Sequence, residues 1–133
     1  MKVLFISSGN SKLGISPIIK NQGESLRKAG VDVSYYLIKG KGFRGYLKSI
    51  KPLKNFIKQN KVDIVHAHYS MSAFVGSLAG VKPLVVSLMG SDVQGGYLSK
   101  LLIKIFYKLS WKTAIVKSVR MYNHLDIKKV FMC

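Results

Sequence analysis

Short apolar segments alternate along this chain with longer segments of mixed character. The short segments predict buried strands at residues 3–6, 31–38, 64–67, 84–88, 114–116 and 130–132. The longer segments predict helices at residues 17–29, 46–57, 71–79 and 98–109. We expect Pro52 to split the second of these into two short helices, because proline interrupts a helix interior. Apolar strands that alternate with helices predict a Rossmann-like α/β fold, with a parallel sheet covered on both faces, in one domain of residues 1–133.

The loop after the first predicted strand is a candidate phosphate-binding segment. In an open parallel sheet, ligands bind beyond the carboxyl ends of the strands. This loop contains two glycines that allow close backbone approach, and it leads into a helix whose N-terminus favours an anion. The candidate contacts are Gly9, Asn10, Lys12 and Gly14. Their spacing matches neither the dinucleotide fingerprint nor the P-loop, so a plain tight turn is an equally good interpretation.

Two histidines lie at the end of the third predicted strand. His66 and His68 are separated by one residue, so strand alternation places them on the same face. We expect no metal here, because no further ligands follow at the spacing of a metal site. An imidazole facing a cleft can form hydrogen bonds or transfer a proton near neutral pH. We therefore select His68 for that role and expect His66 to be buried and structural.

One of only five acidic residues, Asp92, follows the fourth predicted strand. The glycine two positions before it, Gly90, permits close backbone approach to a ligand. A carboxylate at this edge of the sheet could bind a substrate hydroxyl or position a nucleophile. A helix cap or turn former is an equally good interpretation, because aspartate is common in both positions.

The charge is strongly positive, with 22 lysine and arginine residues and a net charge of +17. Lys100, Lys104 and Lys108 recur at steps of four in an otherwise apolar helical segment, which is typical of a basic helix at a bilayer surface. A second lysine series lies at residues 51, 54, 58 and 61. A purely solvated face is the alternative, but we favour peripheral association with an anionic membrane. No specific nucleic acid is expected, because no recognised reading motif accompanies the charge.

The compartment follows from the absence of targeting signals and disulfides. The single cysteine, Cys133, cannot form an intramolecular disulfide, which fits a reducing compartment. The apolar residues after Met1 are too few for a signal sequence, and no segment is long enough to predict a membrane span. We expect a cytoplasmic protein that contacts the inner face of the cell membrane.

The segments Asp63–His68 and Val85–Asp92 resemble the N-terminal domain of retaining GT-B glycosyltransferases, the group 1 or glycogen-synthase-like superfamily. Residues 2–6, 29–33 and 115–118 continue the resemblance in register. It implies transfer of a sugar from a nucleotide-sugar donor to an acceptor held mainly by this domain, without a metal or other cofactor. The glycine loop would approach the donor diphosphate, and His68 and Asp92 are the catalytic candidates. The predicted acceptor contacts are Tyr69, Gly90 and Ser91.

Two departures from the family pattern affect these expectations. Relatives commonly carry histidine where this chain has Met89, and a thioether cannot transfer a proton. The resemblance also implies a C-terminal donor-binding domain that the 133 residues do not contain. We therefore expect an acceptor-binding half that works with a donor domain or a separate subunit, is inactive alone, and serves a glycan or lipid-linked acceptor in cell-surface polysaccharide synthesis. The alternatives are a basic membrane- or nucleic-acid-binding module and a stand-alone flavodoxin-like nucleotide-binding protein.

Overall fold

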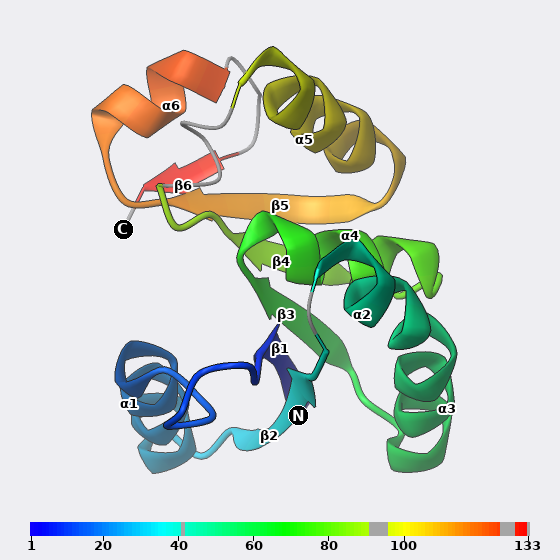
Figure 1. Ribbon diagram of the computed structural model, residues 1–133. Helices are drawn as coiled ribbons and strands as arrows, with labels where there is room; N and C mark the ends of the chain where they lie inside the picture. Colours follow the sequence, from blue (N-terminus) through cyan, green and yellow to red (C-terminus); the bar gives the residue numbers. More distant parts are fainter. Residues whose placement is uncertain (41, 91–95, 126–129, 133) are drawn as a thin grey trace.

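The computed structural model describes residues 1–40, 42–90, 96–125 and 130–132 (Figure 1). These residues form a six-stranded sheet in the order β2-β1-β3-β4-β5-β6, and every neighbouring pair of strands is parallel. The predicted Rossmann-like α/β fold is confirmed. In chain order the elements are β1 (Lys2–Ser8), α1 (Pro17–Lys28), β2 (Asp32–Ile38), α2 (Gly42–Lys48), α3 (Ile50–Asn60), β3 (Ile64–His68), α4 (Ser70–Leu78), β4 (Leu84–Ser87), α5 (Tyr97–Leu109), β5 (Trp111–Val116), α6 (Val119–Leu125) and β6 (Val130–Met132).

Helices cover both faces of the sheet, but unequally. Helix α1 packs over β1 and β2 on one face, around a small core that contains Phe5, Ile19 and Val33. Figure 1 shows α2, α3 and α4 on the side of the sheet opposite α1. The larger core lies on that side and includes residues such as Leu53 of α3 and Ile103 of α5. On the face of the sheet that carries α1, a cavity lies next to this helix, at the ends of β3 and β4.

Most predicted elements are confirmed, but one helix break is misplaced, one helix is missing and one strand starts earlier than predicted. The helical segment at 46–57 is indeed divided, but the break lies at Ser49 and not at Pro52. Pro52 occupies the first turn of α3, where its missing N–H would have no partner within the helix. The short helix α6 was not predicted, and β5 begins at Trp111, three residues before the predicted start.

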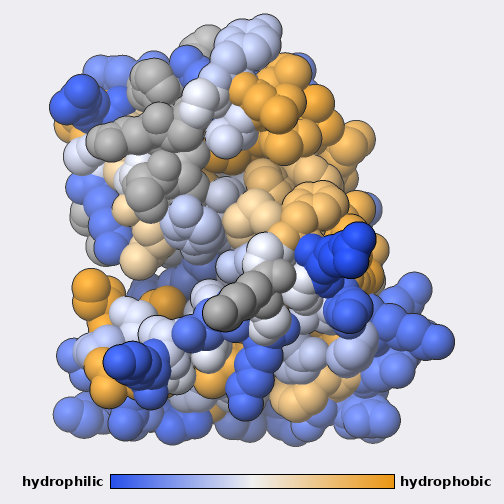
Figure 2. Space-filling model, in the orientation of Figure 1, coloured by the Kyte–Doolittle hydropathy of each residue, from blue (hydrophilic) through white to orange (hydrophobic). Residues whose placement is uncertain are grey.

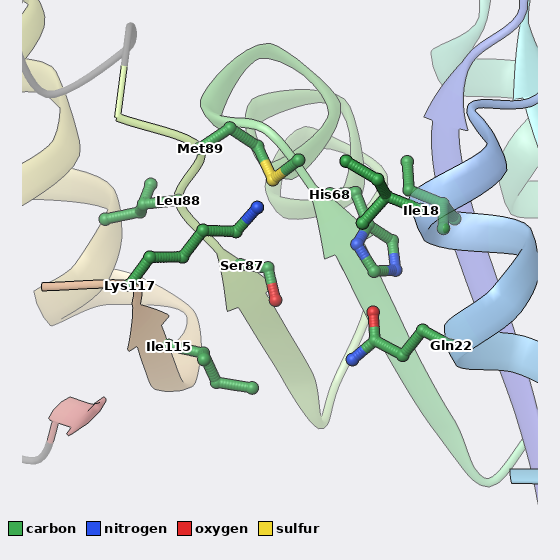
Figure 3. A pocket seen from close by; sticks show the side chains of 9 residues that line it. Ile18, Gln22, His68, Ser87, Leu88, Met89, Ile115 and Lys117 are labelled. Atoms are coloured by element: carbon green, nitrogen blue, oxygen red, sulfur yellow. The ribbon is translucent and has the colours of Figure 1, made fainter. Parts of the chain in front are cut away.

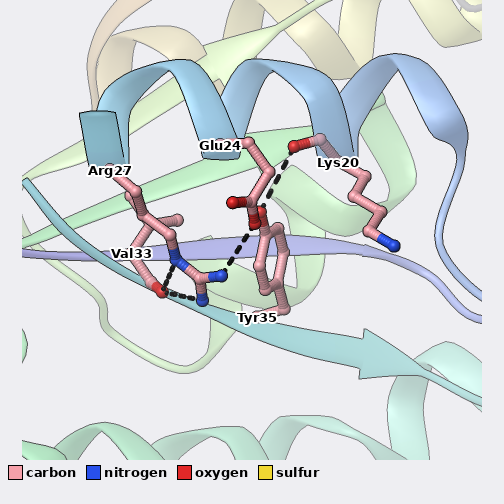
Figure 4. Close-up of polar contacts among 5 residues, drawn as sticks. All are labelled: Lys20, Glu24, Arg27, Val33 and Tyr35. Carbon is pink, nitrogen blue, oxygen red and sulfur yellow. Dashed lines mark hydrogen bonds and ion pairs between the residues drawn. The ribbon is translucent and has the colours of Figure 1, made fainter. Parts of the chain in front are cut away.

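A polar clamp holds α1 on β2 (Figure 4). The Arg27 guanidinium donates two hydrogen bonds to the Val33 carbonyl, at 3.1 and 2.6 Å, and pairs with Glu24 at 2.8 Å. It also lies 5.2 Å from the centroid of the Tyr35 ring. The clamp reaches β2 from the last turn of α1, so it fixes the C-terminal end of this helix. It thereby helps to set the direction of the helix axis, which leads to the carboxyl edge of the sheet at the N-terminus of α1.

A glycine pair fixes α2 against the end of β2. A Cβ added to Gly45 would lie 2.7 Å from the carbonyl oxygen of Gly40, which is closer than side chains approach a backbone. Gly45 is also buried. We therefore expect Gly45→Ala to lower the free energy of unfolding by about 1–3 kcal/mol, as overpacking does elsewhere, despite the better helix propensity of alanine.

Urea denaturation followed by circular dichroism measures this change. Lys48→Ala, on the exposed side of the same helix, is the control and should change the free energy of unfolding by less than about 0.5 kcal/mol. Equal stability of Gly45→Ala and the parent protein would contradict the close backbone contact.

Candidate functional site

Parallel pairing brings the candidate loops to one edge of the sheet. Two cavities lie side by side there and share three lining residues, Ile19, His68 and Met89. His68 ends β3, and Ile19 comes from the first turns of α1. Strand direction predicts that Gly9, His68 and Asp92 converge at this edge. His68 lines both cavities and Gly14 of the glycine loop lines one, but Gly9 lines neither, and Asp92 lies outside the described residues.

The first cavity, of about 400 Å³, is rich in hydroxyl groups. Besides the shared residues, its lining consists of Ser7, Ser8, Ser11, Gly14, Ser16, Tyr46 and Tyr69. The Ser7 side chain is 2% exposed, and its Oγ has no hydrogen-bond partner among the described residues. Ser16 precedes α1 without making a side-chain cap bond. Hydroxyls beside a helix N-terminus provide donors for an anionic or sugar-like group.

The second cavity, of about 360 Å³, is mainly apolar with a few polar groups (Figure 3). It lies between α1 and the ends of β4 and β5, where Ile18, Leu88 and Ile115 supply apolar surface. Figure 3 shows Gln22 and Lys117 extending from opposite sides, from α1 and from the end of β5. A cavity with apolar walls and a few convergent polar groups is the usual form of a small-molecule site.

Between the two cavities lies a stacked histidine pair. The rings of His66 and His68 have centroids 4.3 Å apart, and Phe5 contacts both rings edge to face at 5.0 and 4.7 Å. His66 is buried, as expected, and its Nε2 lies 2.8 Å from the Ser87 Oγ. The Nε2 of His68 has no partner among the described residues, although the side chain is only 2% exposed. A buried polar atom without a partner is costly, so this atom is a natural contact for a ligand.

Burial keeps both histidines neutral. It lowers the pKa of His66 from 6.5 to about 4. The pKa of His68 is lowered to about 3, first by burial and then by the positive charges of His66 and Lys117. His68 is therefore a neutral hydrogen-bonding group at physiological pH, able to accept a hydrogen bond from a ligand but not to supply a proton as an imidazolium.

The glycine loop divides between structural contacts and the cavity. The Gly9 N–H donates to the Ile38 carbonyl at 2.8 Å, and a Cβ there would meet Leu37. The Asn10 amide exchanges two hydrogen bonds with Gly40, at 2.8 and 2.9 Å, which ties the loop to the end of β2. Gly14 lines the hydroxyl-rich cavity and has a φ of +71° in a tight turn closed by a hydrogen bond to the Ser11 carbonyl.

The remaining predicted residues fall partly outside the description. Lys12 is exposed, and Tyr69 lines the hydroxyl-rich cavity with a φ of 82°. Gly90, with a φ of 91°, follows Met89 at the edge of the sheet. Ser91 and Asp92 lie outside the described residues. Their roles, like those of the other site residues, stay predictions.

Sequence reasoning missed several lining residues. Ser87 pairs with His68 across β3 and β4, and strand alternation would have placed it on the face of the histidines had the register been known. Gln22 and Lys117 lack a signal in the sequence, because only the packing of α1 and the position of β5 bring them to the cavity. Ser7 lies just beyond the strand predicted at residues 3–6, but it is the sixth of the seven residues of β1.

Comparisons with known proteins agree with the fold. The profile of the family described as glycosyl transferase 4-like matches residues 3–123. Among solved structures, the chain is similar to a sucrose-phosphate synthase from Thermosynechococcus elongatus, with a TM-score of 0.75 and 14% sequence identity. The similarity covers 100% of this chain and 89% of the other, and at this identity it shows the fold alone. No curated protein matches the chain by sequence.

The neutral histidine pair makes the stability of the fold depend on pH. Below pH 6.5 the unfolded chain takes up protons on both histidines, while the folded protein resists protonation until about pH 4 or 3. Stability is therefore fully present above pH 6.5 and falls as the pH drops. We expect a loss of about 2 kcal/mol or more between pH 7 and pH 5, measured by urea denaturation, since each pKa unit corresponds to about 1.4 kcal/mol.

A His68→Phe variant separates this effect from general acid sensitivity. Phenylalanine retains an aromatic ring beside Phe5 and His66 but cannot be protonated. The variant should lose clearly less stability over the same pH interval than the parent protein. The same loss in both proteins would show that His68 does not contribute.

Proposed function

The chain belongs to the glycosyl transferase 4-like family, and we propose that it is the acceptor-side domain of an enzyme that transfers a sugar from a nucleotide-sugar donor to a glycan or lipid-linked acceptor. It would work with a donor-binding domain, whether on the same polypeptide or on a separate subunit. The proposal includes catalysis without a metal. One observation carries it: two adjacent cavities share a buried histidine whose Nε2 has no partner among the described residues, at the edge where parallel sheets bind ligands.

The hydroxyl-rich cavity is suited to the donor. Its serines and the N-terminus of α1 offer hydrogen-bond donors for diphosphate oxygens, and the positive end of a helix dipole favours their charge. The buried Ser7 hydroxyl, which has no partner among the described residues, would gain one from the donor. In this arrangement Gly14 allows close backbone approach, and Lys12 is available at the surface as a counter-charge.

The apolar cavity is suited to the acceptor. Its apolar walls would pack against a sugar ring or the start of a lipid, while Gln22 and Lys117 would bind hydroxyl or phosphate groups. The neutral His68 would accept a hydrogen bond from the acceptor hydroxyl and hold it in position for attack on the donor sugar. Tyr69 and the loop from Gly90 through Asp92 complete this side in the proposal, with Asp92 as the second catalytic candidate.

His68 is the sharpest point at which to test this proposal. In the enzyme assembled with its donor-binding domain, we expect His68→Leu to lower kcat/KM about tenfold to hundredfold, the loss of one hydrogen bond to a reacting group. His68→Gln, which restores a polar group near the position of Nε2, should recover part of that loss. Transfer of labelled sugar from a panel of nucleotide sugars to extracted glycans and glycolipids measures the rates.

Two controls make the outcome decisive. Lys28→Ala changes an exposed residue at the end of α1, remote from the carboxyl edge, and should leave transfer unchanged. Thermal unfolding establishes that each variant is folded. Full activity of a folded His68→Leu enzyme would remove His68 from the proposed site.

Asp92 can be tested in the same assay. We expect Asp92→Ala to impair transfer more than Asp126→Ala, because Asp92 follows β4 on the carboxyl side whereas Asp126 follows α6. A carboxylate that binds a substrate hydroxyl contributes about 1.5–3 kcal/mol to transition-state binding. If the two variants lose activity equally, Asp92 acts as a turn former only.

A further inference from the structure

Helix α5 exposes apolar side chains on its outer surface. Leu98 and Leu109 are 68% and 69% exposed, and Leu101 and Ile105 between them are 40% and 42% exposed. These four residues recur at steps of three and four, so they form one stripe along the length of the helix. Figure 2 shows hydrophobic surface gathered at the upper right, where Figure 1 places α5. We call these four residues the α5 stripe.

The α5 stripe is not the core-facing side of the helix. Ile103 is fully buried and Phe106 is partly buried against the main core, so the helix already has an inward apolar face. Helix α5 is therefore apolar on two sides. The inner side packs on the core, and the outer side has no partner among the described residues. Continuous exposed apolar surface of this kind marks an interaction site.

A row of lysines borders the stripe. With about 3.6 residues per turn, Lys108 and then Lys104 lie on one flank of the apolar stripe, whereas Lys100 lies farther round the helix, away from the stripe. No aspartate or glutamate occurs between residues 96 and 125. Lysines in this position can keep their ammonium groups in water while the apolar residues beside them enter a bilayer interface.

The row ends in a lysine-lined groove at the other edge of the sheet. A groove of about 390 Å³ lies where α5 passes into β5 and where β4 begins. Three lysines line it, Lys82, Lys108 and Lys112, together with Leu109, the last residue of the α5 stripe. The groove lies at the amino ends of β4 and β5, so it is separate from the two cavities at the carboxyl edge. Three ammonium groups beside an apolar side chain match a lipid phosphate with its acyl chains.

Helix α3 provides an internal comparison. Its lysines, Lys51, Lys54 and Lys58, recur in the same way and are exposed. Its large apolar residues are different, because Leu53 is buried and Phe56 and Ile57 pack against the main core. The lysine series of α3 is therefore a solvated face, whereas that of α5 accompanies an exposed apolar stripe.

We propose that α5 docks this protein on an anionic bilayer, with the α5 stripe in the interface and the groove formed by Lys82, Lys108 and Lys112 on lipid phosphates. In the described part of the chain, no helix is long and apolar enough to cross a membrane. The docking surface is independent of sugar transfer. A second copy of this chain is disfavoured as the occupant, because pairing two α5 surfaces would bring two lysine rows together. Nucleic acid would leave the α5 stripe unused.

Vesicle sedimentation with matched variants tests the proposal. The protein should pellet with vesicles of phosphatidylcholine and phosphatidylglycerol in about equal parts, poorly with phosphatidylcholine alone, and less as the salt concentration rises. We expect K82Q/K108Q/K112Q to weaken binding about tenfold or more, while K51Q/K54Q/K58Q, with the same change in net charge, weakens it less than about threefold. L98S/L109S should also weaken binding about tenfold.

Each alternative result overturns the proposal. Equal losses in the two lysine triples would mean that net charge alone drives binding. Undiminished binding of L98S/L109S, or of L101S/I105S if the first pair does not fold, would mean that the α5 stripe stays out of the bilayer. Displacement of the protein by inorganic phosphate at the same phosphate concentration would make the groove a site for free phosphate. Tighter binding to homopolymeric RNA than to vesicles would identify a nucleic-acid surface instead, and dimerisation abolished by L98S/L109S would identify a self-association surface.

Discussion

The parallel pairing of β1, β3 and β4 is the constraint on which the arrangement of this protein depends. Because these strands run in the same direction, the segments that follow them emerge together, although they are separated by about twenty to eighty residues of sequence. The crossover helices then have to return along the faces of the sheet. Strand direction thus determines both where the cavities lie and which helices have an outer surface to offer a partner.

The histidine pair shows how the core and the site share the same residues. Phe5, on the interior strand β1, packs against both imidazole rings and belongs to the core beneath α1. This packing excludes water, which lowers the pKa of both histidines and raises the cost of the His68 Nε2, which has no partner within the described part of the chain. His66 meets that cost through Ser87, whereas His68 leaves it to whatever enters the cavities. The two histidines differ in their hydrogen bonding because they lie two residues apart along β3.

The sequence predicted the parts of the structure that repeat and missed those that depend on packing. Apolar strands and their alternation with helices were sufficient for a parallel sheet, and alternation along β3 was sufficient to place His66 and His68 on one face. Pro52 misled the helix boundary, because proline is a breaker only inside a helix and is tolerated in its first turn. Gln22 and Lys117 could not be anticipated, since their presence in one cavity depends on how α1 lies across the sheet relative to β5. The exposure of the α5 stripe could not be predicted either, because it depends on which of the two apolar sides of α5 packs against the core.

Helix α5 connects two parallel strands, so its axis runs roughly antiparallel to them, over about 20 Å. A helix that lies flat on a bilayer would hold the strands parallel to the bilayer plane, and the cavities would then open sideways along the surface. An acceptor embedded in the same leaflet would reach such an opening by lateral diffusion. Its encounter with the site would be governed by its surface density in the leaflet rather than by its concentration in the surrounding volume.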